Sequence, residues 1–231
     1  MTLFVMNSRP GIRVHLGVLL FAICCFLPTA AVAKMVRGVI LEKGEPVAAR
    51  LYIESDAGKW YHAVSADKSG APAVNYRVDR GVSKEIHTSL PASEFTADLP
   101  PGEYTLTVRR GKEYREVSQR VTVPSGDTPP SRIRIEIKRW IHMADRGWYS
   151  GDTHVHRSVA DTSGAILAED LNVAFPLTYW VTTAHESPTK AAKSVKSPPG
   201  NQPIEIAPGH VIYPLNTEYE LFTYGGKRHT L

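Results

Sequence analysis

Short stretches of alternating apolar and polar residues dominate residues 35–139, and Gly, Pro, Asp and Ser interrupt them. The clearest stretch is residues 103–110, in which Tyr104, Leu106 and Val108 alternate with other side chains. Successive side chains of a β-strand point to opposite faces, so these three residues predict a strand with one buried face. The region lacks a long apolar repeat of 3.6 residues, which an amphipathic helix requires.

A second alternating stretch spans residues 132–138, where Ile133, Ile135 and Ile137 are separated by charged residues. Several short strands separated by turn residues favour an antiparallel β-sandwich. We therefore expect residues 34–139 to form such a sandwich, within a chain of the α+β class. Weaker strand candidates occur at residues 36–41, 49–54, 74–78 and 116–123.

A Pro-Gly-x-Tyr turn and strand occurs within residues 99–108, Leu-Pro-Pro-Gly-Glu-Tyr-Thr-Leu-Thr-Val. This segment resembles the strand signature of carboxypeptidase-regulatory-like modules, which are related to transthyretin. Residues 36–40 and 46–49 resemble the first two strands of that family. The resemblance implies a structural or adhesive role for this module. His62 and His87 are expected at the surface, because neither has a paired carboxylate or histidine nearby.

The first 33 residues have the pattern of an export signal. Arg9 and Arg13 come before or at the start of an apolar stretch, residues 14–27, and Ala31-Val32-Ala33 provides a small-x-small cleavage pattern. The apolar stretch is shorter than the roughly 20 residues that span a bilayer core. We therefore expect cleavage, no stable membrane anchor afterwards, and a secreted or periplasmic protein.

Cleavage after Ala33 would change the thiol content and the charge. Both cysteines, Cys24 and Cys25, would be lost, so no disulfide could stabilise the mature chain. Two of the 27 Lys and Arg residues would also be lost, leaving 25 against 23 Asp and Glu, a net charge of +2 instead of +4. The sequence has no basic cluster with interleaved aromatic residues, so we expect no nucleic-acid partner.

Six of the nine histidines follow residue 140, and two of them lie in Gly-Asp-Thr-His-Val-His at residues 151–156. Residues two apart in a strand face the same side, so His154 and His156 can reach one metal ion, with Asp152 behind them. Neutral imidazoles bind divalent transition metals, and a nearby carboxylate can ligate the ion or orient a histidine. This pattern therefore predicts a divalent metal site.

The longer motif at residues 147–156, Gly-Trp-Tyr-Ser-Gly-Asp-Thr-His-Val-His, is similar to the first motif of PHP (polymerase and histidinol phosphatase) metallohydrolases. Within that superfamily it most resembles the carbaryl-hydrolase-like branch, whose members often carry a small β-module ahead of the catalytic domain. The resemblance implies a distorted (β/α) barrel that binds divalent ions, here zinc, manganese or iron. It also implies a small-molecule substrate with a phosphoester, carbamate, amide or ester bond. Metal-activated water would attack that bond.

Beyond the first motif, the sequence departs from the family pattern at the expected metal ligands. Residues 166–174 predict a short helix and a turn, and residues 175–180 predict an apolar strand. Family members usually end that strand in Thr-Asp-His, whereas residues 178–180 are Thr-Tyr-Trp. Either the site binds fewer metal ions, or His185 and Glu186 substitute for the missing ligands. A solvated loop is the competing interpretation of those two residues.

Residues 209–220 predict a buried strand that ends in acidic residues. By resemblance, Glu218 corresponds to a metal-bridging glutamate, with Glu220 as the alternative, and His229 corresponds to a ligand or substrate-contacting histidine. His210 precedes the strand and is expected to be structural. The candidate site residues are His154, His156, Glu218 and His229 for metal binding, and Asp152 and Glu218 for catalysis.

The region after residue 139 is short for a barrel, because a full (β/α) barrel takes about 200 residues or more. The resemblance therefore predicts an incomplete, apparently truncated barrel segment at residues 140–231. Two main functions remain open, with a secreted metal-binding protein without turnover between them, and the sequence indicates no oligomeric state. One is an exported metal-dependent hydrolase of PHP type. The other is an exported β-sandwich binding or interaction module that carries a degenerate catalytic remnant, which the Thr-Tyr-Trp sequence favours.

Overall fold

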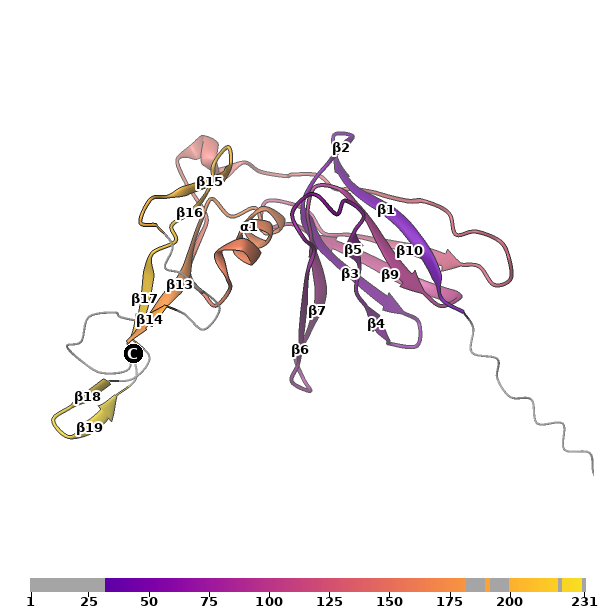
Figure 1. Cartoon of the computed structure of the whole chain (residues 1–231). Helices are drawn as coiled ribbons and strands as arrows, with labels where there is room; N and C mark the ends of the chain where they lie inside the picture. The colour runs from indigo at the N-terminus through magenta and orange to yellow at the C-terminus, as the bar shows by residue number, and fades with distance from the viewer. Residues whose placement is uncertain (1–31, 182–189, 192–199, 220–221, 230–231) are drawn as a thin grey trace, which may run out of the picture. The chain divides into compact units, whose positions relative to one another are not determined.

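A computed structural model describes residues 32–181, 190–191, 200–219 and 222–229. This part of the chain is rich in β-strands and contains a single α-helix (Figure 1). Most of the expected signal segment lies outside the described residues, as do Cys24, Cys25, His185, Glu186 and Glu220.

The first region of the chain folds into two sheets. One is five-stranded, in the order β11-β1-β8-β5, with β2 paired to β1; β1 and β11 run parallel, and the other pairs are antiparallel. Its strands are β1 (Lys34–Glu42), β2 (Glu45–Pro46), β5 (Val64–Ser65), β8 (Glu94–Leu99) and β11 (Ile133–Glu136). The other is six-stranded and antiparallel, in the order β10-β9-β3-β7-β6, with β4 paired to β3. Its strands are β3 (Ala49–Ser55), β4 (Trp60–Tyr61), β6 (Val74–Asp79), β7 (Lys84–Leu90), β9 (Gly102–Arg109) and β10 (Val117–Val123).

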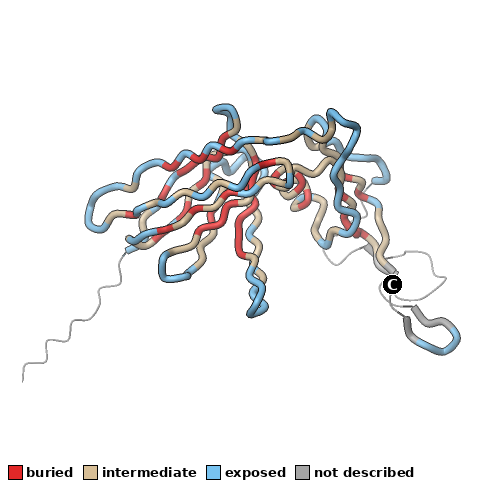
Figure 2. The backbone as a smooth tube through the Cα atoms, turned by 180° about the vertical axis from the view of Figure 1, so that it is seen from behind, coloured by how far each residue is buried: buried red, intermediate tan, exposed pale blue. Residues whose placement is uncertain are grey.

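Both sheets contribute apolar side chains to one shared core. Tyr104, Leu106 and Val108 of β9 are each at most 2% exposed, as their alternation predicts. Ile133 and Ile135 of β11, on the other sheet, belong to the same cluster. Figure 2 shows buried residues concentrated along these strands, with exposed residues mostly at the turns between them. The predicted alternation in both stretches is therefore confirmed.

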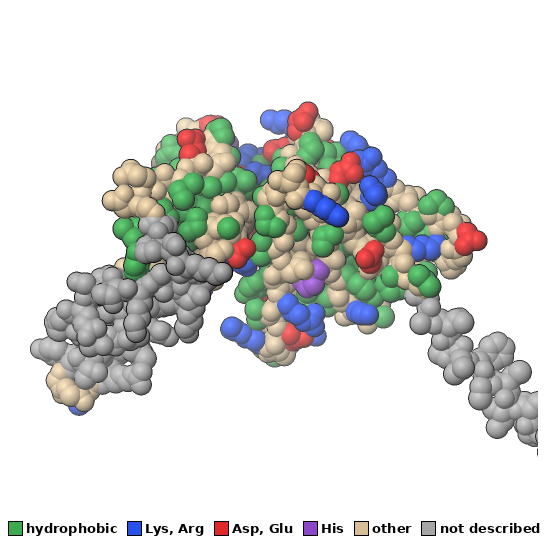
Figure 3. Space-filling view, in the orientation of Figure 1, with side chains coloured by type: hydrophobic (Ala, Val, Ile, Leu, Met, Phe, Trp, Pro, Cys, Tyr) green, Lys and Arg blue, Asp and Glu red, His purple; other side chains and the backbone are tan. Residues whose placement is uncertain are grey.

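The expectation that His87 lies at the surface is wrong. His87 is only 5% exposed, because β7 lies between β3 and β6 in its sheet and also contacts α1. His62 is half-buried, and its Nδ1 lies 3.4 Å from the hydroxyl oxygen of Thr88. At the tip of the β6–β7 hairpin, by contrast, exposed side chains of both charges lie together (Figure 3).

A strand-helix-strand unit follows these two sheets. β12 (Gly151–Val155) and β13 (Val173–Val181) pair in parallel, and α1 (Val159–Ala168) connects them. The side chain of Ser158 caps α1 by accepting the backbone N–H of Asp161. The helix thus begins seven residues before the predicted position 166. No helix among the described residues is long and apolar enough to cross a membrane.

β13 also pairs in parallel with β16 (His210–Ile212) and β17 (Asn216–Tyr219). The prediction of one continuous strand over residues 209–220 is therefore wrong. Pro214 lies in the break between β16 and β17, and it has no N–H to donate to a neighbouring strand. The other elements are η1 (Met143–Arg146), β14 (Lys190–Ala191), β15 (Ile204–Ala207), β18 (Phe222–Tyr224) and β19 (Lys227–His229).

Side-chain contacts tie the end of α1 to the first two sheets. The carboxylate of Asp170, 7% exposed, lies 3.1 Å from Arg110 Nη2 and 2.7 Å from Arg139 Nη2. Gly111 approaches the same turn so closely that an added Cβ would lie 2.5 Å from the carbonyl oxygen of Glu169. The helix α1 is thereby held against β3, β6 and β7, which it contacts directly.

Candidate metal centre

Three of the four predicted metal ligands lie together in the structure. The Nε2 atoms of His154 and His156 are 3.0 Å apart. Glu218 reaches both rings, with Oε1 at 3.4 Å from His154 Nε2 and Oε2 at 3.5 Å from His156 Nε2. One ligand atom from each of the three residues can be chosen so that all lie within 4.8 Å of one another.

The sheet topology explains why Glu218 meets two histidines that lie 64 and 62 positions before it. β12 and β17 lie on opposite sides of β13, and both run parallel to it. The carboxyl ends of parallel strands meet at one edge of a sheet, which is where ligand sites of such sheets usually lie. His154 and His156 come from the end of β12, and Glu218 is opposite Trp180 near the end of β13.

The donor set and its spacing fit a divalent metal ion. An ion bound to two imidazole nitrogens at about 2.0–2.1 Å separates them by about 2.9 Å at a right angle and about 3.4 Å at a tetrahedral angle. The observed 3.0 Å lies within this interval. Two imidazoles and a carboxylate also form a ligand set suited to zinc, iron or manganese.

The three side chains differ in exposure. Those of His154 and His156 are 60% and 52% exposed, whereas that of Glu218 is 18% exposed. The carboxylate thus lies beneath the two rings, and the outer side of the group is open to solvent.

Asp152 lies apart from this three-residue group. Its Oδ1 accepts the backbone N–H of His154 at 3.0 Å. The carboxylate therefore fixes the backbone that carries His154, and the irregular pairing between β12 and β13 begins at this residue. Asp152 also lines a pocket on the side of α1.

The remaining sequence candidates divide into structural residues and one that is described only in part. His210 Nδ1 lies 2.7 Å from the carbonyl oxygen of Leu171, which confirms its expected structural role. Thr178 is fully buried, and its hydroxyl donates to the carbonyl oxygen of Pro214 at 2.8 Å. The backbone of His229 pairs with Phe222 in a hairpin, and its side chain lies outside the described part.

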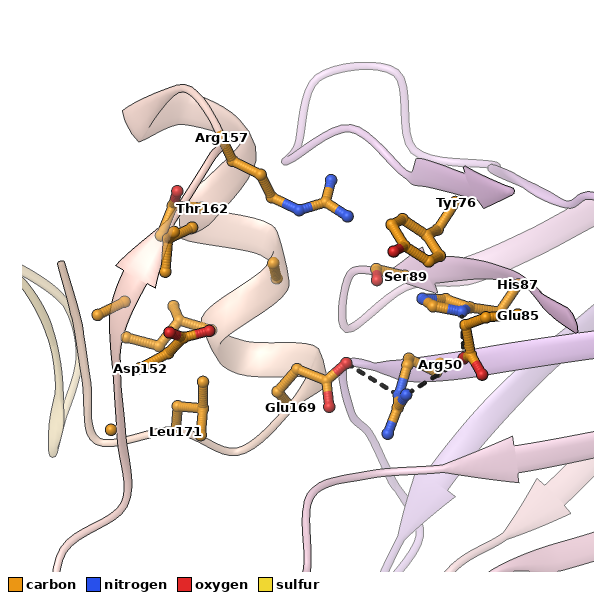
Figure 4. Close-up of a pocket in the computed structure, with 15 residues that line it drawn as sticks. Arg50, Tyr76, Glu85, His87, Ser89, Asp152, Arg157, Thr162, Glu169 and Leu171 are labelled. Carbon is orange, nitrogen blue, oxygen red and sulfur yellow. Dashed lines mark hydrogen bonds and ion pairs between the residues drawn. The ribbon is translucent and has the colours of Figure 1, made fainter. Parts of the chain in front are cut away.

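A pocket beside β12 contains groups that sequence reasoning missed. It has a volume of about 470 Å³ and lies between α1 and strands β3, β6 and β7 (Figure 4). Arg50, His87 and Arg157 contribute polar atoms to its wall. The expectation that His87 has no carboxylate nearby is wrong, because Glu85 lies two residues before it in the same strand and contacts it. This spacing is the local signal that could have indicated a paired histidine.

Comparisons of this chain with protein-family models, curated proteins and solved structures found no match.

Proposed function

We propose that this protein is an exported metal-dependent hydrolase of PHP type that acts on a small molecule. In this proposal residues 34–139 are a carboxypeptidase-regulatory-like, transthyretin-related β-sandwich. Residues 140–231 are the opening part of a PHP-type (β/α) barrel. The observation that carries the proposal is the convergence of His154, His156 and Glu218, which come from strands that run parallel to β13 and whose carboxyl ends meet.

The proposal assigns a role to each residue of the centre. His154 and His156 supply neutral imidazole nitrogens, and Glu218 supplies a carboxylate that faces both rings. Asp152 positions His154 through its backbone N–H. A divalent ion, when bound, would supply a Lewis acid that polarises the scissile bond and makes water a stronger nucleophile near neutral pH.

The strand-helix-strand unit supports the barrel assignment. A parallel strand pair connected by a helix is the repeating unit of (β/α) barrels, and their active sites lie at the carboxyl ends of the strands. β12, α1 and β13 form one such unit, and the histidines follow its first strand. The fold of the two preceding sheets, with their shared core, agrees with a sandwich module.

A second candidate is a binding module that carries a degenerate catalytic centre. Its support is the end of β13, where family members place further ligands. Tyr179 and Trp180 stand there in place of the Asp and His of the family pattern. In that case the protein would bind a metal ion through His154 and His156 and would not turn over a substrate.

The test is a hydrolysis screen of the purified protein with zinc, manganese or ferrous iron. Suitable probes are 4-nitrophenyl esters of phosphoric, carbamic and acetic acids and a 4-nitroanilide. The hydrolase proposal predicts metal-dependent turnover of one probe class. Glu218→Gln should lower kcat/KM by about 10- to 100-fold, as for other groups that hold metal sites. The exposed His142→Ala variant serves as the control.

No metal-dependent turnover of any probe by a protein that binds metal would favour the second candidate. Equal activity of the Glu218→Gln variant and the unchanged protein would contradict the proposed role of Glu218.

A further inference from the structure

The pocket beside β12 is a second site, built from both regions of the chain. One face of α1 lines it through Thr162, Ala165, Ile166 and Glu169, which follow the spacing of a single helix face. The opposite wall comes from β3, β6 and β7 (Figure 4). Its volume of about 470 Å³ lies within the range of small-molecule sites.

Two carboxylates in the wall are already paired with a cation. Arg50 lies with Nε at 2.9 Å from Glu169 and with Nη1 at 3.4 Å from Glu85. The hydroxyl of Tyr52 also donates to Glu85. Arg50 therefore offsets part of the negative charge of both acids, and Glu169 also interacts electrostatically with Arg157.

His87 offers a hydrogen-bond acceptor beside them. Burial lowers its pKa to about 4, so the ring is neutral near neutral pH. Its Nδ1 lies 2.9 Å from Glu85 Oε1 without hydrogen-bond geometry. A proton on that nitrogen faces a carboxylate, whereas a lone pair there would be repelled by it, so the neutral ring favours the tautomer with the proton on Nδ1. Nε2 then carries a lone pair, and in Figure 4 this end of the ring faces the pocket beneath Tyr76.

Arg157 supplies a cation at the other end of the pocket. Its guanidinium lies 5.5 Å from the centre of the Tyr76 ring, and the opposed Tyr76 and His87 rings are 5.2 Å apart. Within the part of the chain that the structure describes, Arg157 makes no ion pair. Figure 4 shows its guanidinium reaching into the pocket from the start of α1.

An arginine held over an aromatic ring keeps its N–H groups in one plane, with the edge free for a ligand. This edge matches the two oxygens of a carboxylate. Val155, Ile166 and Leu171 also line the pocket and offer apolar contact. The pocket therefore presents guanidinium N–H donors for a carboxylate, apolar side chains in its wall and, at His87, an acceptor for a ligand hydroxyl or N–H.

We propose that this pocket binds a small organic carboxylate that carries a hydroxyl group. Arg157 binds the carboxylate, and His87 Nε2 accepts the hydroxyl proton in a hydrogen bond. This site is separate from the metal centre and does not depend on it, although Asp152 lies between the two. The first region of the chain therefore contributes a binding function as well as a structural one.

The test uses isothermal titration calorimetry on the purified protein with EDTA present, so that metal binding does not contribute. The ligands are 4-hydroxybenzoate, 4-hydroxyphenylacetate and the neutral 4-hydroxybenzamide, with inorganic phosphate as a second anion. We expect one of the two carboxylates to bind, and the benzamide and phosphate to bind at least about tenfold more weakly.

Two variants assign the binding to the pocket. Arg157→Gln should weaken carboxylate binding by about tenfold or more, whereas the exposed Arg146→Gln should leave it unchanged. His87→Phe should weaken binding of the hydroxylated ligand and leave that of benzoate unchanged. Circular dichroism shows whether each variant is folded.

The proposal is overturned if neither carboxylate binds at about 10 mM, if phosphate binds as tightly, or if folded Arg157→Gln binds like the unchanged protein. The calorimetry excludes metal and measures no turnover, so it tests the pocket alone. Failure of the hydrolase proposal would leave carboxylate binding unaffected, and failure of carboxylate binding would leave the hydrolase proposal unaffected.

Discussion

Replacing Asp170 with Asn removes the charge that joins the end of α1 to the first two sheets. Asp170 is 7% exposed and contacts Arg110 at 3.1 Å and Arg139 at 2.7 Å. Asn has nearly the same shape but leaves both guanidinium groups without their shared anion. Breaking a buried ion pair in this way costs about 3–5 kcal/mol of unfolding free energy.

We expect a loss somewhat below this range, about 2–3 kcal/mol, because Arg139 is 23% exposed and also pairs with Glu113. For a domain of this size the loss corresponds to a decrease in Tm of about 4–12 °C. Urea and thermal unfolding, followed by circular dichroism, measure both quantities. Asp127→Asn, at an exposed turn residue, is the matched control.

If Asp170→Asn lowered the free energy of unfolding by less than about 0.5 kcal/mol, this reasoning would be refuted, because ordinary surface substitutions have effects of that size. The double variant with Arg110→Gln provides a second check. If the two residues interact as described, the effects should be non-additive by about 1–3 kcal/mol.

Two further predictions concern the same junction. Gly111→Ala should lower the free energy of unfolding by about 1–3 kcal/mol, since its φ is +49° and an added Cβ would lie 2.5 Å from the Glu169 carbonyl oxygen; urea unfolding equal to that of the unchanged protein would contradict this. His87 has a folded pKa of about 4, below its unfolded value of about 6.5, so the unfolded state binds a proton first as pH falls. Its contribution to stability is therefore present above about pH 6.5 and is lost between about pH 6.5 and 4. Burial raises the pKa of Glu169, which acts in the opposite direction. The measurement is therefore the difference in pH dependence between the unchanged protein and His87→Gln, expected to be about 2–3 kcal/mol over this interval, and parallel curves would count against it.

The strand β9, with one buried face, was predictable from its alternation, whereas the strand β7, covered on both faces, was not. Tyr104, Leu106 and Val108 alternate with less buried residues because only one face of β9 meets the core. Strand β7 has no such pattern, because residues 86–90 are all buried and include His87, Thr88 and Ser89. The cover on its second face comes partly from α1, about 75 residues later in the chain, which no local pattern reveals.

More of the metal centre than of the pocket could be predicted from the sequence, because two of its three residues are close together in the chain. His154 and His156 are two apart in one strand, so their shared side follows from strand geometry alone. The place of Glu218 came from the resemblance to PHP enzymes. The pocket, by contrast, joins residues as far apart as Arg50 and Glu169, and only the packing of α1 on β3, β6 and β7 brings them together.

Metal content is the measurement that tests the account most directly. The purified protein is incubated with zinc or manganese, dialysed, and analysed by elemental mass spectrometry alongside a His154→Ala/His156→Ala variant and the His142→Ala control. The account predicts stoichiometric metal in the unchanged protein and in the control, and its loss in the double variant while the circular dichroism spectrum stays the same. Folded protein that retains no metal, or a double variant that retains all of it, would contradict the assignment of His154, His156 and Glu218 as a metal centre.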